Sequence, residues 1–454
     1  MRWTVLVSTI LSCASLAVRA QDSNADAHVV LISIDGFAAS RLEDEGLELP
    51  NLRAIIRSGA WAESSETVMP SRDHTAHTSI TTGVSPAVHG VIGNRLLNRE
   101  TGEYFQMTNK PRAESIQVPT LFDAAKQAGL TTAAFFWPET SADPSIDFGI
   151  PAVLTDNGRA SRSGADPAFL QELRENEIPI DLFFQWDYDL EIQTSADRIL
   201  TRAAAYTLET YKPNLLAIRL PATDRYQHQY GPDHYLSKAA FSAADANVGI
   251  LRRAAEHAGL ARTTTFFVVS DHGFHTVPFS VNILPLFREA GLIGKVNLHT
   301  GFWSVEVELT EQFQPNRDQR TLDDTFERAL RLEGVNRIIR PEEHEAMGLP
   351  RYEDNKYVLG HYIVLGDIDT RVMIDEDSDS TRRTRLRQPY YDHGALPSHE
   401  LMYPILLARG RRIRENVRIG HVHNYDIAPT ICELLGLEMP GLPGRVLGEM
   451  LEPR

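Results

Sequence analysis

The sequence has only two cysteines among its 454 residues, Cys13 and Cys432. Cys13 lies in an N-terminal apolar stretch that we expect to be removed, so Cys432 is alone in the mature chain. A single cysteine excludes an intrachain disulfide, even in an oxidising compartment. The stability of a chain of this length must therefore come from a large buried core.

The sequence also lacks an excess of positive charge. It has 45 Lys and Arg residues against 61 Asp and Glu residues, which gives a formal net charge of -16. A stable nucleic-acid partner is not expected, because such binding usually requires a basic face. A small anionic substrate is not excluded, since bound cations can reverse the local field.

No stretch of the sequence is apolar for long enough to span a membrane. Residues 1–20 carry Arg2, an apolar run from Val5 to Val18, and Ala20 before a polar segment. The run is too short for a membrane anchor and is typical of a secretory signal peptide. We predict a mature chain that begins at residue 21 and is exported, to the periplasm or the extracellular space.

Apolar, β-rich runs alternate with amphipathic helical patterns along most of the chain. The predicted strands are 28–34, 131–137, 214–220, 264–270 and 403–408, and the predicted helices are 49–56, 119–128, 196–211, 237–257 and 426–435. This alternation is typical of an α/β fold with a mainly parallel central sheet and helices on both faces.

The regular alternation of strand-like and helical segments changes near residue 280. Residues 303–309 and 357–364 alternate or look like edge strands, 322–332 reads as a helix, and 375–387 reads as a charged loop. We predict that residues 21–284 and 386–454 form the core and that residues 285–385 form a smaller inserted α+β cap. Residues 139–180 are rich in Pro, Gly, Ser and Asp and predict a long loop with short helical pieces.

Acidic and histidine side chains follow three of the predicted core strands. The carboxyl ends of parallel strands meet at one edge of a sheet, where α/β proteins bind ligands. Carboxylate and imidazole ligands together suit zinc and related divalent ions. One such residue alone is more often part of a turn, but the whole group predicts a metal site. Its members are Asp35, Asp224, His228, Asp271, His272 and the later His393.

A turn from Pro70 to Asp73 leads into a predicted helix that ends at Gly83. Ser71, Asp73 or Thr75 could cap this helix. Backbone N–H groups at a helix start favour an anion, so a phosphate or sulfate group could bind there.

Together these motifs resemble the alkaline phosphatase superfamily, and in particular its nucleotide pyrophosphatase/phosphodiesterase (type I phosphodiesterase) family. The resemblance covers about residues 28–280 and 385–450. It implies an alkaline phosphatase-like fold and a phosphohydrolase that acts on small phosphate esters. The matching segments are Ile34-Asp35-Gly36, Ala76-His77-Thr78, Asp224 to His228, Ser270-Asp271-His272-Gly273 and His393-Gly394.

The resemblance also implies two divalent metal ions, usually zinc. Asp224, His228 and His393 would hold one ion. Asp35, Asp271 and His272 would hold the other. Asn94 falls where the family has an asparagine that binds a substrate phosphate oxygen, and Asp73 falls where it has a threonine nucleophile that also touches a metal.

An aspartate in place of the threonine leaves four roles open. Asp73 could complete the metal site while water activated there attacks directly, or it could itself be phosphorylated. Ser71 or Thr75 could replace the nucleophile, or the site could bind metal and ligand without turnover. We expect a metal-dependent phosphoric ester hydrolase. The alternatives are a lapsed family member that acts as a binding protein, and a sulfatase-like hydrolase, whose Cys/Ser-x-Pro-x-Arg motif is not matched at Ser71.

Overall fold

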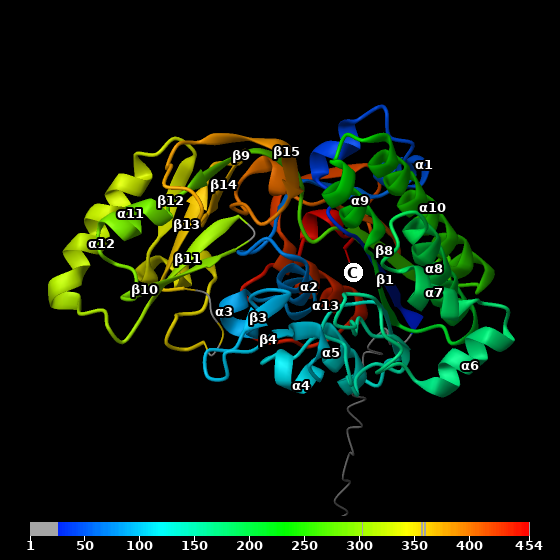
Figure 1. Cartoon of the computed structure of the whole chain (residues 1–454). Helices are drawn as coiled ribbons and strands as arrows, with labels where there is room; N and C mark the ends of the chain where they lie inside the picture. The colour runs from blue at the N-terminus through cyan, green and yellow to red at the C-terminus, as the bar shows by residue number, and fades with distance from the viewer. Residues whose placement is uncertain (1–25, 302, 356, 358–359, 454) are drawn as a thin grey trace, which may run out of the picture.

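The computed structural model describes residues 26–301, 303–355, 357 and 360–453. The predicted signal peptide, residues 1–20, lies outside this part of the chain. The described chain is built around an eight-stranded sheet with the strand order β17-β2-β16-β8-β1-β7-β5-β6 (Figure 1). This arrangement confirms the predicted α/β fold with a mainly parallel central sheet.

Strand β1 lies at the middle of the sheet, and all seven of its residues are buried. It pairs in parallel with β7 on one side and β8 on the other, as expected for an apolar strand covered on both faces. Only β16 runs antiparallel to its neighbours β8 and β2. The eight strands are β1 (His28–Ile34), β2 (Ala60–Glu66), β5 (Thr132–Phe135), β6 (Phe148–Ile150), β7 (Leu215–Leu220), β8 (Thr264–Val269), β16 (Leu406–Gly410) and β17 (Val417–His423).

Helices cover both faces of this sheet. Val30 and Ile32 of β1 pack into one apolar cluster, and the alternating Val29 and Leu31 pack into a second. The first cluster includes α1 (Pro50–Arg57), α6 (Pro167–Glu175), α7 (Ile180–Trp186), α8 (Gln193–Thr210) and α10 (Tyr235–His257). The second includes α2 (Asp73–Thr82), α5 (Leu121–Gln127) and α13 (Ile427–Leu435).

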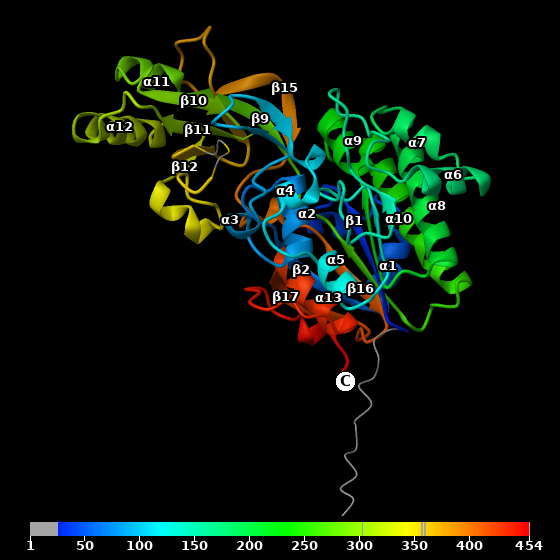
Figure 2. The ribbon, with the colours of Figure 1, turned by 90° about the horizontal axis from the view of Figure 1, so that it is seen from below.

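A second, antiparallel sheet with the order β10-β11-β13-β12 lies to one side of the first (Figures 1 and 2). Its side chains and those of two helices form a separate apolar core that includes Phe287, Phe326 and Val364. The boundaries 284/285 and 385/386 of the predicted insertion stay a prediction. The elements here are α11 (Leu284–Glu289), β10 (Val296–Thr300), β11 (Ser304–Leu309), α12 (Pro315–Leu330), β12 (Val335–Ile339) and β13 (Tyr362–Gly366).

A three-stranded sheet joins the two parts of the molecule. It has the order β14-β9-β15, with β9 (His275–Asn282), β14 (Thr370–Met373) and β15 (Thr384–Asp392). The start of β15 falls in the predicted charged loop, which is therefore partly a strand paired with β9. Similarly, the predicted loop 139–180 contains β6, whose three residues are too few to show a periodic pattern.

Candidate metal site

The structure brings all seven predicted metal ligands to the carboxyl edge of the central sheet. Asp35 follows β1, and Asp271 and His272 follow β8. Asp224 and His228 lie on helix α9 (Ala222–Tyr230), which follows β7, and His393 follows β15. Their ligand atoms form two main groups, each with all its atoms within 4.8 Å of one another. One group is Asp224, His228 and His393, and the other is Asp35, Asp73, Asp271 and His272.

The three histidines are oriented by backbone carbonyl groups. Nδ1 of His228 lies 2.8 Å from the carbonyl oxygen of Tyr391, and Nδ1 of His393 lies 2.9 Å from that of Ser71. Nδ1 of His272 lies 2.9 Å from the carbonyl oxygen of Gly273. Because a carbonyl oxygen only accepts, each Nδ1 must donate, and each neutral ring presents the lone pair of Nε2 to the cluster. Histidines that bind metals are held in this way.

Several polar atoms of the cluster are buried without a hydrogen-bond partner among the described residues. They are Asp35 Oδ1, Asp224 Oδ1, Asp271 Oδ2 and His272 Nε2. Leaving such atoms unsatisfied is costly, and a cation between them would satisfy them. A mixed set of carboxylate oxygens and imidazole nitrogens fits zinc and related divalent ions. The residues present therefore fit the two ions that the sequence resemblance implies.

The cluster is electrostatically arranged to attract cations. Burial lowers the pKa of His228, but the neighbouring Asp224 outweighs it and raises the pKa to about 10. In the same way, burial lowers the pKa of His272 while Asp271 raises it to about 9. Burial raises the pKa of Asp35 well above its usual range, and nearby carboxylates add to this effect. Protons and metal ions therefore compete for the same nitrogen atoms.

Asp73 lies between the two groups, at the first position of α2. Its Oδ2 atom is 3.8 Å from His272 Nε2 and 3.8 Å from His393 Nε2. Asn94 Nδ2 donates a hydrogen bond of 2.9 Å to the same oxygen. Burial opposes ionisation of Asp73, but Arg219 and the two histidines hold its pKa well below the usual range. An ionised carboxylate thus lies between the two groups, at the position where the sequence resemblance predicts a nucleophile.

The remaining candidates around the helix start have other contacts. Asn94 Oδ1 accepts a hydrogen bond of 3.1 Å from the backbone N–H of His74, so Asn94 joins the helix start to the Asp73 carboxylate. The Ser71 hydroxyl donates to the carbonyl oxygen of Ala395 over 2.8 Å. The buried Thr75 hydroxyl has no hydrogen-bond partner among the described residues. Ser71 therefore supports the loop that follows His393.

Arg219 is a site residue that the sequence reasoning missed. It lies on β7, is 8% exposed, and directs its guanidinium group at two carboxylates. Its Nε donates to Asp35 Oδ2 over 2.7 Å, and its Nη2 forms an ion pair with Asp73 Oδ1. The available signal was a single charged residue in the otherwise apolar run LLAIRL.

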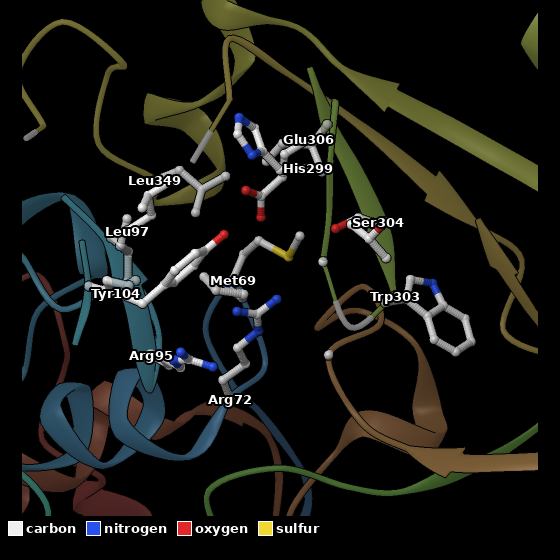
Figure 3. Close-up of a pocket in the computed structure, with 17 residues that line it drawn as sticks. Met69, Arg72, Arg95, Leu97, Tyr104, His299, Trp303, Ser304, Glu306 and Leu349 are labelled. Atoms are coloured by element: carbon white, nitrogen blue, oxygen red, sulfur yellow. The ribbon is translucent and has the colours of Figure 1, made fainter. Parts of the chain in front are cut away.

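A cavity of about 340 Å³ adjoins this cluster where the core meets the second sheet. Arg72 and Gly394, which line it, are the chain neighbours of Asp73 and His393. Tyr104 comes from the hairpin of β3 (Arg95–Leu97) and β4 (Tyr104–Gln106), and Glu306 comes from β11. Figure 3 shows Arg72, Tyr104 and Glu306 with their polar ends directed into the cavity. Burial raises the pKa of Glu306 to about 7, against the influence of Arg72.

The chain is similar to known proteins in both sequence and structure. The Xenopus laevis bis(5'-adenosyl)-triphosphatase enpp4 is 21% identical over 435 residues, which cover 95% of this chain and 83% of that protein. Human ectonucleotide pyrophosphatase/phosphodiesterase family member 1 is 24% identical over 54% of this chain. Human ectonucleotide pyrophosphatase/phosphodiesterase 5 shares the fold, with a TM-score of 0.68 and 17% identity over 94% of this chain and 100% of that one.

Some of these relatives are much longer than this chain. The matched segment spans 23% of human family member 1 and 44% of a Naja atra venom phosphodiesterase that is 19% identical. The sequence model of one protein family matches residues 29–394, which is most of this chain. The chain belongs to the type I phosphodiesterase / nucleotide pyrophosphatase family.

Proposed function

We propose that this protein is a metal-dependent phosphoric ester hydrolase that cleaves phosphodiester or pyrophosphate bonds of small substrates. The observation that supports this most strongly is the convergence of seven carboxylate and imidazole groups on two neighbouring points. The three histidines have their Nε2 atoms turned toward those points by backbone carbonyl groups. So many ionisable groups would be costly to bury together without cations.

Two divalent ions, zinc by preference of the donor set, fit this cluster. Asp224, His228 and His393 would hold one, and Asp35, Asp271 and His272 would hold the other, with Asp73 between them. Ions at these points would polarise phosphoryl oxygens and make a bound water a stronger nucleophile. Asn94 would orient the phosphoryl group beside the Asp73 carboxylate, to which its side chain already donates.

The position of Asp73 favours one of the four roles left open by the sequence. Its ionised carboxylate lies within 3.8 Å of one histidine from each metal group. We infer that Asp73 completes the metal site and that water, not a side chain, attacks phosphorus. Thr75 is the remaining hydroxyl candidate, because the Ser71 hydroxyl is already bound to a backbone carbonyl group.

The cavity beside Arg72 would receive the part of the substrate beyond the reacting phosphate. Its lining mixes the apolar Met69 and Leu349 with the ionisable Arg95 and Glu306. Such a lining fits an amphipathic group better than a purely anionic one. Relatives are named for dinucleotide and nucleotide substrates, and a murine relative was solved with AMP as an inactive threonine-to-alanine variant. A nucleotide-containing ester is therefore a sensible first substrate.

The test is a panel of esters offered to metal-loaded and metal-stripped protein. It should include a nucleoside monophosphate nitrophenyl ester, bis-nitrophenyl phosphate, a phosphomonoester and a sulfate ester. We expect turnover of the two diesters that disappears on chelation and in His393→Ala. The matched control is His257→Ala, because His257 is exposed and pairs only with Glu209 among the described residues. A preference for the sulfate ester would contradict the proposal.

The second candidate function is metal-dependent binding without turnover. The observation in its favour is that Asp73 replaces the expected hydroxyl nucleophile and is itself held in contacts with Arg219 and Asn94. Metal content does not separate the two functions. If the protein binds AMP and divalent ions but cleaves none of the esters, the binding function stands.

We also infer that the mature protein is exported. The support is the sequence of residues 1–20, together with the names of relatives described as ectoenzymes or venom enzymes. Within the described part of the chain, no helix has the length and apolarity needed to cross a bilayer. N-terminal sequencing of the protein from the periplasm or medium should find residue 21 or a close neighbour as the first residue.

A further inference from the structure

We propose that Arg219 is a positioning residue that holds Asp73 as a permanent metal ligand and keeps it from acting as a nucleophile. The inference rests on the proposed metal site, and it assigns a specific role to a residue outside the set of expected ligands. Arg219 reaches the cluster from β7, a strand that is buried along its whole length.

Both oxygens of the Asp73 carboxylate are engaged. Oδ1 pairs with Nη2 of Arg219, and Oδ2 accepts from Nδ2 of Asn94. Each carboxylate oxygen keeps a second lone pair, so Oδ2 can still bind a cation, whereas turning Oδ1 toward phosphorus would break its ion pair with Arg219. The contacts therefore fix Asp73 with Oδ2 facing the two histidine nitrogens, each 3.8 Å away.

The planar guanidinium group serves two carboxylates at once. Nε of Arg219 donates to Asp35 Oδ2, and Nη2 reaches Asp73 Oδ1. The opposite oxygen, Asp35 Oδ1, stays without a hydrogen bond among the described residues, so it remains available to a cation. A lysine, with one point charge at the end of a flexible stem, cannot form this bridge.

The positive charge of Arg219 also offsets the negative charge that Asp73 adds to the site. The family's threonine is neutral as a side chain, whereas Asp73 adds a negative charge to a cluster that already contains Asp35, Asp224 and Asp271. Two divalent ions would balance these four carboxylates and leave no attraction for an anionic ester. With the buried charge of Arg219 included, the two ions and the four carboxylates leave a net charge of about +1 at the site, which would favour binding of an anionic phosphodiester.

A double-mutant cycle with Co²⁺ as the probe tests this role. Co²⁺ is titrated into the native protein, Asp73→Thr, Arg219→Met and the double variant, and both the dissociation constant and the absorption spectrum are recorded. Loss of the arginine charge acts in both backgrounds alike, so the difference between the backgrounds isolates the positioning of Asp73. Outer contacts of this kind typically change metal affinity 10- to 100-fold.

We expect Arg219→Met to weaken Co²⁺ binding at least about tenfold more in the Asp73 background than in the Asp73→Thr background. It should change the Co²⁺ spectrum more in the former, because the contact of Arg219 with Asp35 is lost in both backgrounds. Equal effects in both backgrounds would overturn the inference. Arg112→Met is the matched control, because Arg112 forms a similar ion pair with Asp123 outside this site.

Arg219→Lys covers the case in which Arg219→Met does not fold. Lysine keeps the positive charge but cannot contact Asp35 and Asp73 together. Arg219→Lys is therefore also expected to weaken Co²⁺ binding more in the Asp73 background than in the Asp73→Thr background. A lysine variant with native affinity and spectrum would overturn the inference, as would a phosphoryl group found on Asp73 after acid quenching. If native protein binds no Co²⁺ at all, the proposed function fails instead.

Discussion

Removal of metal should lower the thermal stability of the protein as well as any activity. Four buried atoms of the cluster have no hydrogen-bond partner among the described residues, namely Asp35 Oδ1, Asp224 Oδ1, Asp271 Oδ2 and His272 Nε2. Each unsatisfied buried group costs about 1–3 kcal/mol, so the four together would cost at most about 4–12 kcal/mol, less what their contacts with protonated His228 and His272 recover in the metal-free protein. Cations that satisfy them would recover much of this free energy.

The stabilisation expected from ion binding to the folded state alone has a similar magnitude. An ion held at a free concentration of 1,000 times its dissociation constant stabilises the folded state by about 4 kcal/mol, or about 8 kcal/mol for two ions. The entropy of unfolding near the midpoint is about 2 cal/mol/K per residue, hence roughly 0.9 kcal/mol/K for a chain of this length. The expected difference in Tm between loaded and stripped protein is therefore on the order of 9 °C.

The assay is differential scanning calorimetry of protein whose metal content has been measured before and after chelation. Readdition of Zn²⁺ should restore the Tm, and Asp224→Ala should show a smaller shift because it removes a ligand of one ion only. His257→Ala should behave like the native protein. An unchanged Tm in protein shown to have lost its metal would refute the reasoning, because the orphaned atoms would then cost nothing.

Three further outcomes are expected. Asp73→Ala should weaken divalent-ion binding at least about tenfold in a chelator competition, and unchanged binding would make the carboxylate a bystander. Metal affinity should fall as the pH is lowered from 9 to 6, because the pKa of His272 is raised to about 9 and a proton must leave before the metal binds; a flat profile would contradict this. Glu306→Gln should raise the Tm relative to the native protein at pH 8 and not at pH 4, because the raised pKa of Glu306, about 7, means that stability is lost as the pH rises from about 4.5 through 7; equal Tm differences at the two pH values would count against it.

The central sheet was predictable because its strands are buried on both faces. A strand such as β1 must be apolar at every position, and the resulting run is visible in sequence. Strand β2, with the sequence AWAESSE, mixes buried, partly buried and exposed residues and contains several polar side chains. Its pairing with β17, more than 350 residues away in the register Ala60 with Val417, is a tertiary contact that no local pattern records.

The candidate site was predictable for a similar reason. The topology of a parallel sheet brings strand ends together, so residues at those ends can be grouped before their distances are known. His393 was the exception, since it follows β15 and reaches the site through the return of the chain from the second sheet. His393 was assigned from the family motif. In the structure its Nδ1 atom contacts the carbonyl oxygen of Ser71, two residues before Asp73, and this contact holds the ring at the site.

Arg219 was not predictable by the rule that found the other residues. That rule looks at the ends of strands, whereas Arg219 lies inside β7 and reaches the edge through its long side chain. The rule that applies instead concerns charge: an arginine in a fully buried strand must have an anionic partner. Asp73 and Asp35 are those partners, and neither would reveal the pairing from sequence position alone.

A single Asp73→Thr change would consequently leave the Arg219 guanidinium with one partner fewer and a reactive hydroxyl beside it. We therefore expect covalent catalysis through the introduced hydroxyl to require replacement of Arg219 as well as Asp73, and a fully active Asp73→Thr protein would show that the two positions are independent.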